Sequence, residues 1–264
     1  MPDSPRWFRL SACASLALLG LGAAVQGCGR PAGPVTLRVL AGSSLTEAFG
    51  EIGMAYEQEH RGVKVRSAFG GSQEMTARLA GREPADVLVT SDVPAMDGAE
   101  GYLTGPRPIV AHNSLTIAVA PGDPRRIRGL ADLVRPGLRV VVGAPTVPVG
   151  RYARQIFARA GLTVQWGVEE ISARAVLDRV RAGEADAGLV FITDLRSAGA
   201  AAGSVPIPAA QNVTAAYPAA AVKDGDHTEA AETFVTWLTS PAAVRLFHKY
   251  GFATPAAPPA GAPR

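Results

Sequence analysis

The sequence predicts an α/β fold with two lobes, each a mostly parallel sheet flanked by helices. From Val35 onward, short apolar segments of strand character alternate with amphipathic segments of helical character, which is the pattern of βαβ units. The strands are numerous, and large open sheets tend to split into two. We expect the chain to cross between sheets near residues 109–113 and 205–212. The first lobe then comprises residues 35–110 plus 211–255, and the second comprises residues 111–210.

The first lobe begins with an apolar strand at residues 35–40. A helix is expected next, because Leu45, Phe49 and Ile52 recur at helical spacing. The following segments repeat this order: helix 44–60, strand 63–69, helix 72–81 and a buried strand at 85–92. In such units the loops after the strands face the same edge of the sheet.

The middle of the chain continues the alternation of strands and helices. Strands are expected at residues 114–120, 138–144 and 185–191, and helices at residues 129–134, 150–161 and 172–183. A loop rich in alanine, glycine and proline is expected after these. Two amphipathic helices, 228–238 and 241–251, then close the chain. Because they follow the second crossing, they should complete the first lobe.

The N-terminus has the pattern of a secretory signal. Arg6 and Arg9 precede an apolar run over residues 10–25, which favours a cleaved signal over a permanent membrane helix. The run ends in VQGC, which resembles a bacterial lipobox, so we predict a signal peptide at residues 1–27, lipidation of Cys28 and a tether at residues 28–34. Cys13 would leave with the signal, and no internal disulfide could form.

Composition excludes several classes of protein. The 264 residues are 47% hydrophobic and 19% charged, which is ordinary for a globular protein. A net charge of +3 is too weak to indicate nucleic-acid binding. The four histidines lack metal-ligand spacing, so no direct cation ligands are expected. Residues 256–264, rich in proline and alanine, are predicted to be a disordered tail.

Two turns between a strand and a helix carry serines, Ser44 in AGSSLTEAF and Ser72 in FGGSQEM. Ser44 precedes Glu47 by three residues, which is a capping box and needs no ligand. Alternatively, the free N–H groups and the positive end of each helix could hold an anion from two sides. The glycines before each serine would let the backbone approach it closely.

Two further helix starts, near Val149 and Ala173, bring the number of candidate turns to four. Few charged residues lie among them. A fully deprotonated oxyanion needs only donors, whereas phosphate that retains a proton also needs an acceptor. The pattern therefore favours a tetrahedral dianion.

Motifs for catalysis are absent from the two serine turns. Neither Ser44 nor Ser72 lies in G-x-S-x-G or S-x-x-K, and the chain has no phosphate-cradling G-x-x-x-x-G-K. A secreted serine hydrolase that uses one of these serines remains a remote alternative. We expect no enzymatic activity and no cofactor.

A series of segments resembles the periplasmic molybdate-binding proteins of molybdate ABC importers. The resemblance is almost continuous from Val35 to Phe252 and includes VLAGSSLTEAF, FGGSQEMTARL, PADVLVTSD, VGAPTVPVGRYARQIFARAGL, GEADAGLVFITD, NVTAAYPAAAVKD and FVTWLTSPAAVRLFHKYGF. It implies a hinged type II periplasmic-binding-protein fold that closes on molybdate or tungstate and delivers it to a membrane permease. The expected protein is an extracytoplasmic monomer, anchored to the membrane by lipid at Cys28. Sulfate, phosphate or a phosphonate are the alternative ligands.

The resemblance also implies five ligand contacts. Ser44 and Ser72 match serines that donate through side chain and backbone. Val149 and Ala173 match residues that donate through backbone N–H groups. The fifth contact in the family is a tyrosine hydroxyl, and Phe191 stands at its position. One lost hydrogen bond to a charged ligand costs ~1.5 to 3 kcal/mol, unless water or a neighbour such as Thr193 replaces it.

Overall fold

The computed structural model describes residues 34–255. The predicted signal peptide, the lipidation site Cys28, most of the tether and the tail at 256–264 lie outside the described residues. Within residues 34–255, no helix combines the length and the apolar character needed to cross a membrane.

The first sheet joins segments from both ends of the described chain. Its order is β2-β1-β3-β11-β4, and β5 also pairs with β11. Strands β1 to β3 are parallel, whereas β11 is antiparallel to β3, β4 and β5. The strands are β1 (Val35–Gly42), β2 (Val63–Gly70), β3 (Val87–Val89), β4 (Leu103–Thr104), β5 (Ile109–Asn113) and β11 (Ala215–Val222).

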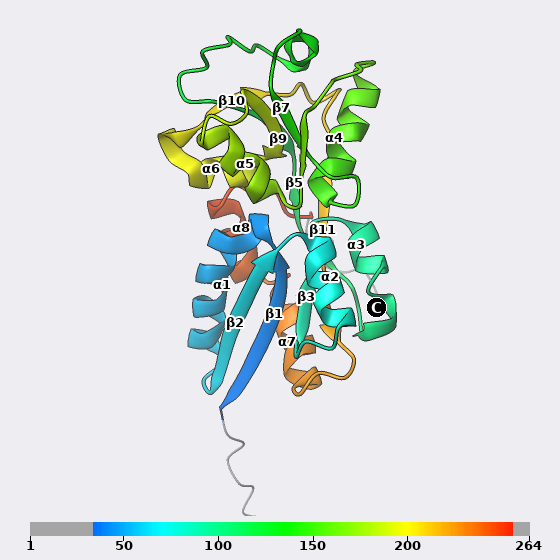
Figure 1. The fold of residues 1–264 in the computed structure, drawn as a ribbon. Helices are drawn as coiled ribbons and strands as arrows, with labels where there is room; N and C mark the ends of the chain where they lie inside the picture. The colour runs from blue at the N-terminus through cyan, green and yellow to red at the C-terminus, as the bar shows by residue number, and fades with distance from the viewer. Residues whose placement is uncertain (1–33, 256–264) are drawn as a thin grey trace, which may run out of the picture. The chain divides into compact units, whose positions relative to one another are not determined.

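Helices cover both faces of the first sheet because its strands bury alternate side chains on opposite sides. Leu37 and Val39 of β1 belong to the cluster packed with one group of helices, and Leu40 belongs to the cluster packed with the other. Figure 1 shows the helices around the strands of this sheet. The first group is α1 (Thr46–Glu59), α7 (Thr228–Trp237) and α8 (Pro241–Lys249); the second is α2 (Ser72–Ala80) and α3 (Val93–Asp97). The two closing helices, α7 and α8, therefore pack on the first sheet.

The second sheet is built from the middle of the chain. Its order is β10-β6-β9-β7-β8, in which β9, β7 and β8 are parallel and β6 and β10 are antiparallel to their neighbours. Its strands are β6 (Leu115–Val119), β7 (Val140–Gly143), β8 (Val168–Glu170), β9 (Ala187–Phe191) and β10 (Gly203–Pro206). Helix α4 (Pro148–Arg159) packs on one face, and α5 (Ala173–Arg181) and α6 (Ile192–Ala198) on the other.

Two sheets flanked by helices confirm the predicted α/β class, while the residue limits of the two lobes stay a prediction. One expectation was wrong: the stretch expected to be a loop holds α6, β10 and β11. Alanine and proline are weak strand formers, so AAYPAAAV gives no strand signal. The strand forms because β11 is buried between β3, β4 and β5, where small side chains fit. Short 3₁₀ helices complete the fold: η1 (Ser43–Leu45), η2 (Glu100–Tyr102), η3 (Leu130–Val134) and η4 (Gly199–Ala201).

Strand register brings the important turns together. Gly42 at the end of β1 lies opposite Gly70 at the end of β2, and Ala41 lies opposite Val89 at the end of β3. The turns that follow these three strands are therefore neighbours at one edge of the first sheet. In the second sheet, Gly143 of β7 pairs with Glu170 of β8, so the turns before α4 and α5 are neighbours as well.

Candidate functional site

One pocket gathers four of the five residues predicted to contact a ligand: Ser72, Val149, Ala173 and Phe191. The space between its lining residues, counted with the solvent at its mouth, is about 190 Å³. Residues of both sheets and of the turns beside them form its wall, namely Ser43, Gly70, Gly71, Ser72, Ser91, Val147, Pro148, Val149, Ser172, Ala173 and Phe191. None of these lining residues carries an ionisable carboxylate, amine, guanidine or imidazole.

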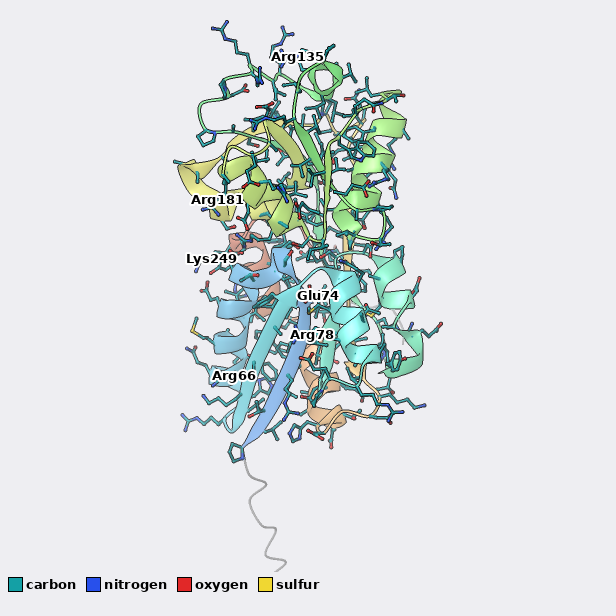
Figure 2. All side chains as sticks on the ribbon, in the orientation of Figure 1. Arg66, Glu74, Arg78, Arg135, Arg181 and Lys249 are labelled. Carbon is teal, nitrogen blue, oxygen red and sulfur yellow. The ribbon has the colours of Figure 1, made fainter. Side chains whose placement is uncertain are left out.

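Charged side chains are numerous on the protein but stay outside this wall. Arg66 on β2 and Glu74 and Arg78 on α2 are labelled in Figure 2, and none of the three lines the pocket. The pocket thus differs from an ion-pair site, since any anion in it would be held by neutral donors.

Three helices begin at the pocket: α2, α4 and α5. The first N–H groups of a helix have no partner within it, and its N-terminus carries roughly half a positive charge. Neither α2 nor α4 has a side-chain cap, whereas the Ser172 hydroxyl caps α5 by accepting from Ala175 N at 3.1 Å. Proline at the first position of α4 has no N–H, so Val149 is the first residue of that helix able to donate.

The Ser72 hydroxyl does not cap its helix. Its oxygen accepts a hydrogen bond from the backbone N–H of Ser91 at 2.9 Å. The side chain is buried, with 2% of Ser72 exposed. The Ser72 hydrogen has no acceptor among residues 34–255, which leaves it available to a ligand oxygen.

Ser44 does not line the pocket, whereas its neighbour Ser43 does. The Ser44 side chain lies behind Ser91, which is a lining residue. Its hydroxyl is 2.9 Å from the Tyr217 hydroxyl and 3.4 Å from that of Ser91. The capping-box interpretation was wrong, because η1 separates β1 from α1 and the helix starts at Thr46 without a side-chain cap. Glu47 forms an ion pair with Arg174 at 2.6 Å rather than serving a cap.

Phe191 is buried against two tyrosines. Its ring meets those of Tyr152 and Tyr217 edge to face, with centroids 6.2 and 5.8 Å away. Thr193, expected as one possible substitute for the missing tyrosine hydroxyl, lines a neighbouring cavity together with Ser44 and not this pocket. Its hydroxyl accepts from the Asn113 amide at 2.8 Å.

Sequence reasoning missed Ser91, which lines the pocket, and the buried pair Asn113 and Tyr217 behind it. A signal for Ser91 was present, since TSD follows the buried strand β3 just as the other serines follow β1 and β2. The segment after it forms only the five-residue helix α3, so no amphipathic run drew attention to this turn.

Side chains of the two halves meet beside the pocket. Arg174 of α5 pairs with Glu47 of α1 at 2.6 Å, and Arg151 of α4 pairs with buried Asp92 at 2.6 Å. The Gln73 amide donates to the Ile171 carbonyl at 2.8 Å. These contacts join the first-sheet elements to the second-sheet elements around the site.

The described residues give no support for a hydrolase or a cation site. Ser44 bonds to Tyr217 and Ser91, and Ser72 to the Ser91 backbone, so within residues 34–255 neither serine has a histidine or carboxylate beside it to act as base. In the same part of the chain, no group of three or more histidine, cysteine, aspartate or glutamate side chains could hold a metal ion.

Comparisons with known proteins agree on a binding protein. The family described as bacterial extracellular solute-binding protein matches residues 37–253. The molybdate-binding protein ModA of Mycobacterium tuberculosis is 36% identical over 260 residues, which cover 95% of this chain and 100% of that protein. The periplasmic molybdate-binding protein of Azotobacter vinelandii shares the fold with a TM-score of 0.68 at 20% identity, covering 83% of this chain and 100% of the other. The sulfate-binding protein SubI of M. tuberculosis also shares the fold, with a TM-score of 0.75 at 20% identity. The match covers 83% of this chain and 87% of SubI.

Proposed function

This chain belongs to the bacterial extracellular solute-binding proteins, and we propose that it captures molybdate, and also tungstate, for import by an ABC permease. One observation carries the proposal: the pocket offers hydroxyl and backbone N–H donors at three helix N-termini and no ionisable side chain in its wall. Such a site suits an anion that is fully deprotonated at neutral pH. The ModA relative supports molybdate as that anion.

The five proposed contacts divide between direct and indirect roles. Ser72 donates through its hydroxyl, and Val149 and Ala173 through their backbone N–H groups. Ser44 contacts the ligand through its backbone, because its side chain lies behind the wall and is bonded to Tyr217 and Ser91. Phe191 contributes an apolar contact where a tyrosine hydroxyl would donate.

Phosphate that retains a proton fits this site poorly, because its P–OH group would face donors only. Sulfate is the stronger competitor, since it also presents four bare oxygens, and the fold shared with SubI is compatible with it. Discrimination between sulfate and molybdate would then depend on the size of the cavity.

Capture would involve closure of two lobes about a hinge, with residues 35–110 plus 211–255 on one side and 111–210 on the other. The contacts Arg174–Glu47, Arg151–Asp92 and Gln73–Ile171 join elements of the two sheets and would form as the lobes close. A binding protein of this kind releases its ligand unchanged, so we assign it no catalytic step.

The proposed setting is outside the cytoplasm, in keeping with the family description. Residues 1–27 would direct export, and lipid on Cys28 would hold the mature monomer at the membrane beside its permease. Cell fractionation tests this part separately: replacement of Cys28 by serine should release the protein from the membrane fraction.

Isothermal titration of the mature protein with molybdate, tungstate, sulfate and phosphate tests the ligand assignment. We expect molybdate and tungstate to bind tightly and sulfate to bind at least tenfold more weakly, a difference of ~1.4 kcal/mol or more. Tight sulfate binding without molybdate binding would assign the protein to the sulfate class. Turnover of an ester that Ser44→Ala or Ser72→Ala abolishes would instead support the hydrolase alternative.

A further inference from the structure

Ser91 stands at the third of the three neighbouring strand ends and is not among the five proposed contacts. It lines the pocket with Ser72, Val149 and Phe191, and only 4% of it is exposed. Its backbone N–H donates to the Ser72 hydroxyl at 2.9 Å, so the two serines are held as a pair. The Ser91 hydroxyl oxygen lies 3.4 Å from the Ser44 hydroxyl oxygen.

A directed series of hydrogen bonds leads from Asn113 toward this hydroxyl. The Asn113 amide oxygen accepts from the N–H of Ser114 at 2.9 Å, which fixes the orientation of the amide group. Its nitrogen therefore faces the hydroxyls of Thr193 and Tyr217, at 2.8 and 3.2 Å. An amide nitrogen only donates, so the Tyr217 oxygen must accept.

The donor direction set by Asn113 can continue through the hydroxyls of Tyr217, Ser44 and Ser91. Burial raises the pKa of Tyr217, which keeps its phenol protonated. Either hydroxyl of the Tyr217–Ser44 pair (2.9 Å) and of the Ser44–Ser91 pair (3.4 Å) can donate. The direction that continues from Asn113 has Tyr217 donating to Ser44 and Ser44 donating to Ser91. In this direction each hydroxyl of the series accepts one hydrogen, and the Ser91 hydrogen is the one that remains for a ligand.

Gly42 makes room for the Ser91 hydroxyl. A Cβ atom on Gly42 would lie 2.3 Å from the Ser91 oxygen and 3.3 Å from the Ser72 oxygen. The backbone of Gly42, with φ −60° and ψ 142°, would accept any residue. Glycine at this position is thus explained by the space that the two hydroxyls occupy and not by its backbone angles.

We propose that Ser91 is a further ligand-binding residue, whose hydroxyl donates to the oxyanion and replaces the donor that Phe191 lacks. Asn113, Tyr217 and Ser44 act as positioning residues that turn this hydrogen into the pocket. The inference rests on the proposed function, since it names an additional donor at the same site. It also supplies a second side-chain hydroxyl donor, beside Ser72, to a site that has phenylalanine at position 191.

Titration calorimetry with molybdate on the mature protein tests the proposal. Ser91→Ala should weaken binding about tenfold or more, because a hydrogen bond to a charged ligand is lost. Tyr217→Phe should weaken it less, and the double variant should match Ser91→Ala alone, because Tyr217 acts through Ser91. Ser204→Ala, which removes a hydroxyl bonded to Thr116 on the second sheet, is the matched control and should leave the affinity unchanged.

A second double-mutant cycle combines Gly42→Ala with Ser91→Ala and measures the affinity for molybdate. The methyl group should displace the Ser91 hydroxyl and weaken binding in the wild-type background. With Ser91→Ala the nearest remaining atom of residue 91, its Cβ, would lie 3.6 Å from the new methyl, so the cost should be smaller. Thermal unfolding of each ligand-free variant shows whether it is folded.

The outcomes separate this inference from the proposed function. Wild-type protein that binds no oxyanion would overturn the proposed function. Wild-type binding with a Ser91→Ala affinity within about twofold of it would overturn the role of Ser91 alone. An equal cost of Gly42→Ala in both backgrounds would also contradict it, because the glycine would then serve something other than the Ser91 hydroxyl.

Discussion

At Ser72, the oxygen and the hydrogen of one hydroxyl group have different tasks. The oxygen is fixed by the Ser91 N–H, and the hydrogen is free for a ligand. We predict that Ser72→Ala weakens molybdate binding about tenfold or more, since a charged ligand loses one donor. The melting temperature should fall only slightly, and calorimetry with thermal unfolding measures the two effects on the same samples.

Ser240 provides the matched control for this prediction. Its hydroxyl caps α8 by accepting from Ala243 N at 3.2 Å, and Ser240 does not line the pocket. Ser240→Ala should lower the free energy of unfolding by ~1 kcal/mol and leave affinity unchanged. If Ser72→Ala behaved like Ser240→Ala, Ser72 would be a structural residue and the anion site would need another donor.

Phe191→Tyr should supply the hydroxyl that the resemblance to molybdate-binding proteins implies at this position. In the wild-type background the gain in molybdate affinity should be small, because Ser91 already donates. In the Ser91→Ala background the tyrosine should recover most of the lost affinity, roughly tenfold. A tyrosine that improves binding in neither background would show that position 191 does not face the ligand as we propose.

The residues of the site were only partly predictable from the sequence. Ser72, Val149, Ala173 and Phe191 do meet in one pocket, because each lies where a strand meets a helix. Ser44 was expected beside them, but the 3₁₀ turn η1 brings Ser43 to the wall instead. Contacts such as Tyr217 to Ser44 join residues 173 positions apart, and no local pattern encodes that pairing.

Among the secondary-structure elements, α5 connects the pocket to the contact between the two halves. Its first residue, Ala173, lines the pocket, and the next, Arg174, pairs with Glu47 of α1. Glu47→Gln should therefore weaken binding by up to about fivefold, since a partly exposed ion pair contributes ~1 kcal/mol or less. The loss should lie mainly in faster ligand dissociation, which stopped-flow fluorescence can measure.

Glu57→Gln is the control for this prediction. Glu57 pairs with Lys64 at 2.8 Å, which links α1 to β2 within the first sheet and leaves the second sheet untouched. Its replacement should not change the dissociation rate. Equal rates for Glu47→Gln and wild type would mean that the Arg174 pair stabilises the fold without taking part in ligand retention.

Periodicity predicted the elements that have a strong apolar pattern. The helices that became α1, α4 and α5 lie close to where the sequence placed them. It did not predict β11, whose residues AAYPAAAV have neither alternation nor strand propensity. That strand owes its existence to partners on three other strands, so only the assembled sheet defines it.

For the molecule as a whole, the buried carboxyl of Asp194 gives stability a pH dependence. It is fully buried, and neither carboxyl oxygen has a hydrogen-bond partner among the described residues. Burial raises its pKa to about 7; nearby Arg174 opposes this rise and Glu47 adds to it. Between pH 4 and 7, roughly, the folded protein keeps a proton that the unfolded chain has released.

The free energy of unfolding should therefore decrease as pH rises through this window and level off above about pH 7. The asparagine of Asp194→Asn stays neutral, so we predict that its free energy of unfolding changes less with pH than that of the wild type. The stability of the variant relative to wild type should therefore be greater at pH 8 than at pH 5. Thermal unfolding across this range measures it. Asp97→Asn removes an exposed carboxylate of α3 and controls for the change in net charge. Parallel slopes for Asp194→Asn and wild type would contradict the assignment.

The meeting of three helix N-termini at one neutral pocket also affects the protein when no ligand is bound. The ends of α2, α4 and α5 carry partial charges of the same sign, and α2 lies on a different sheet from the other two. Without an anion these ends repel one another, which favours separation of the two halves. Under the proposed function, a bound anion would supply the missing counter-charge and favour contact between the two halves. Under the proposed import function, a permease that recognises this arrangement would distinguish loaded from empty protein without contacting the ion itself.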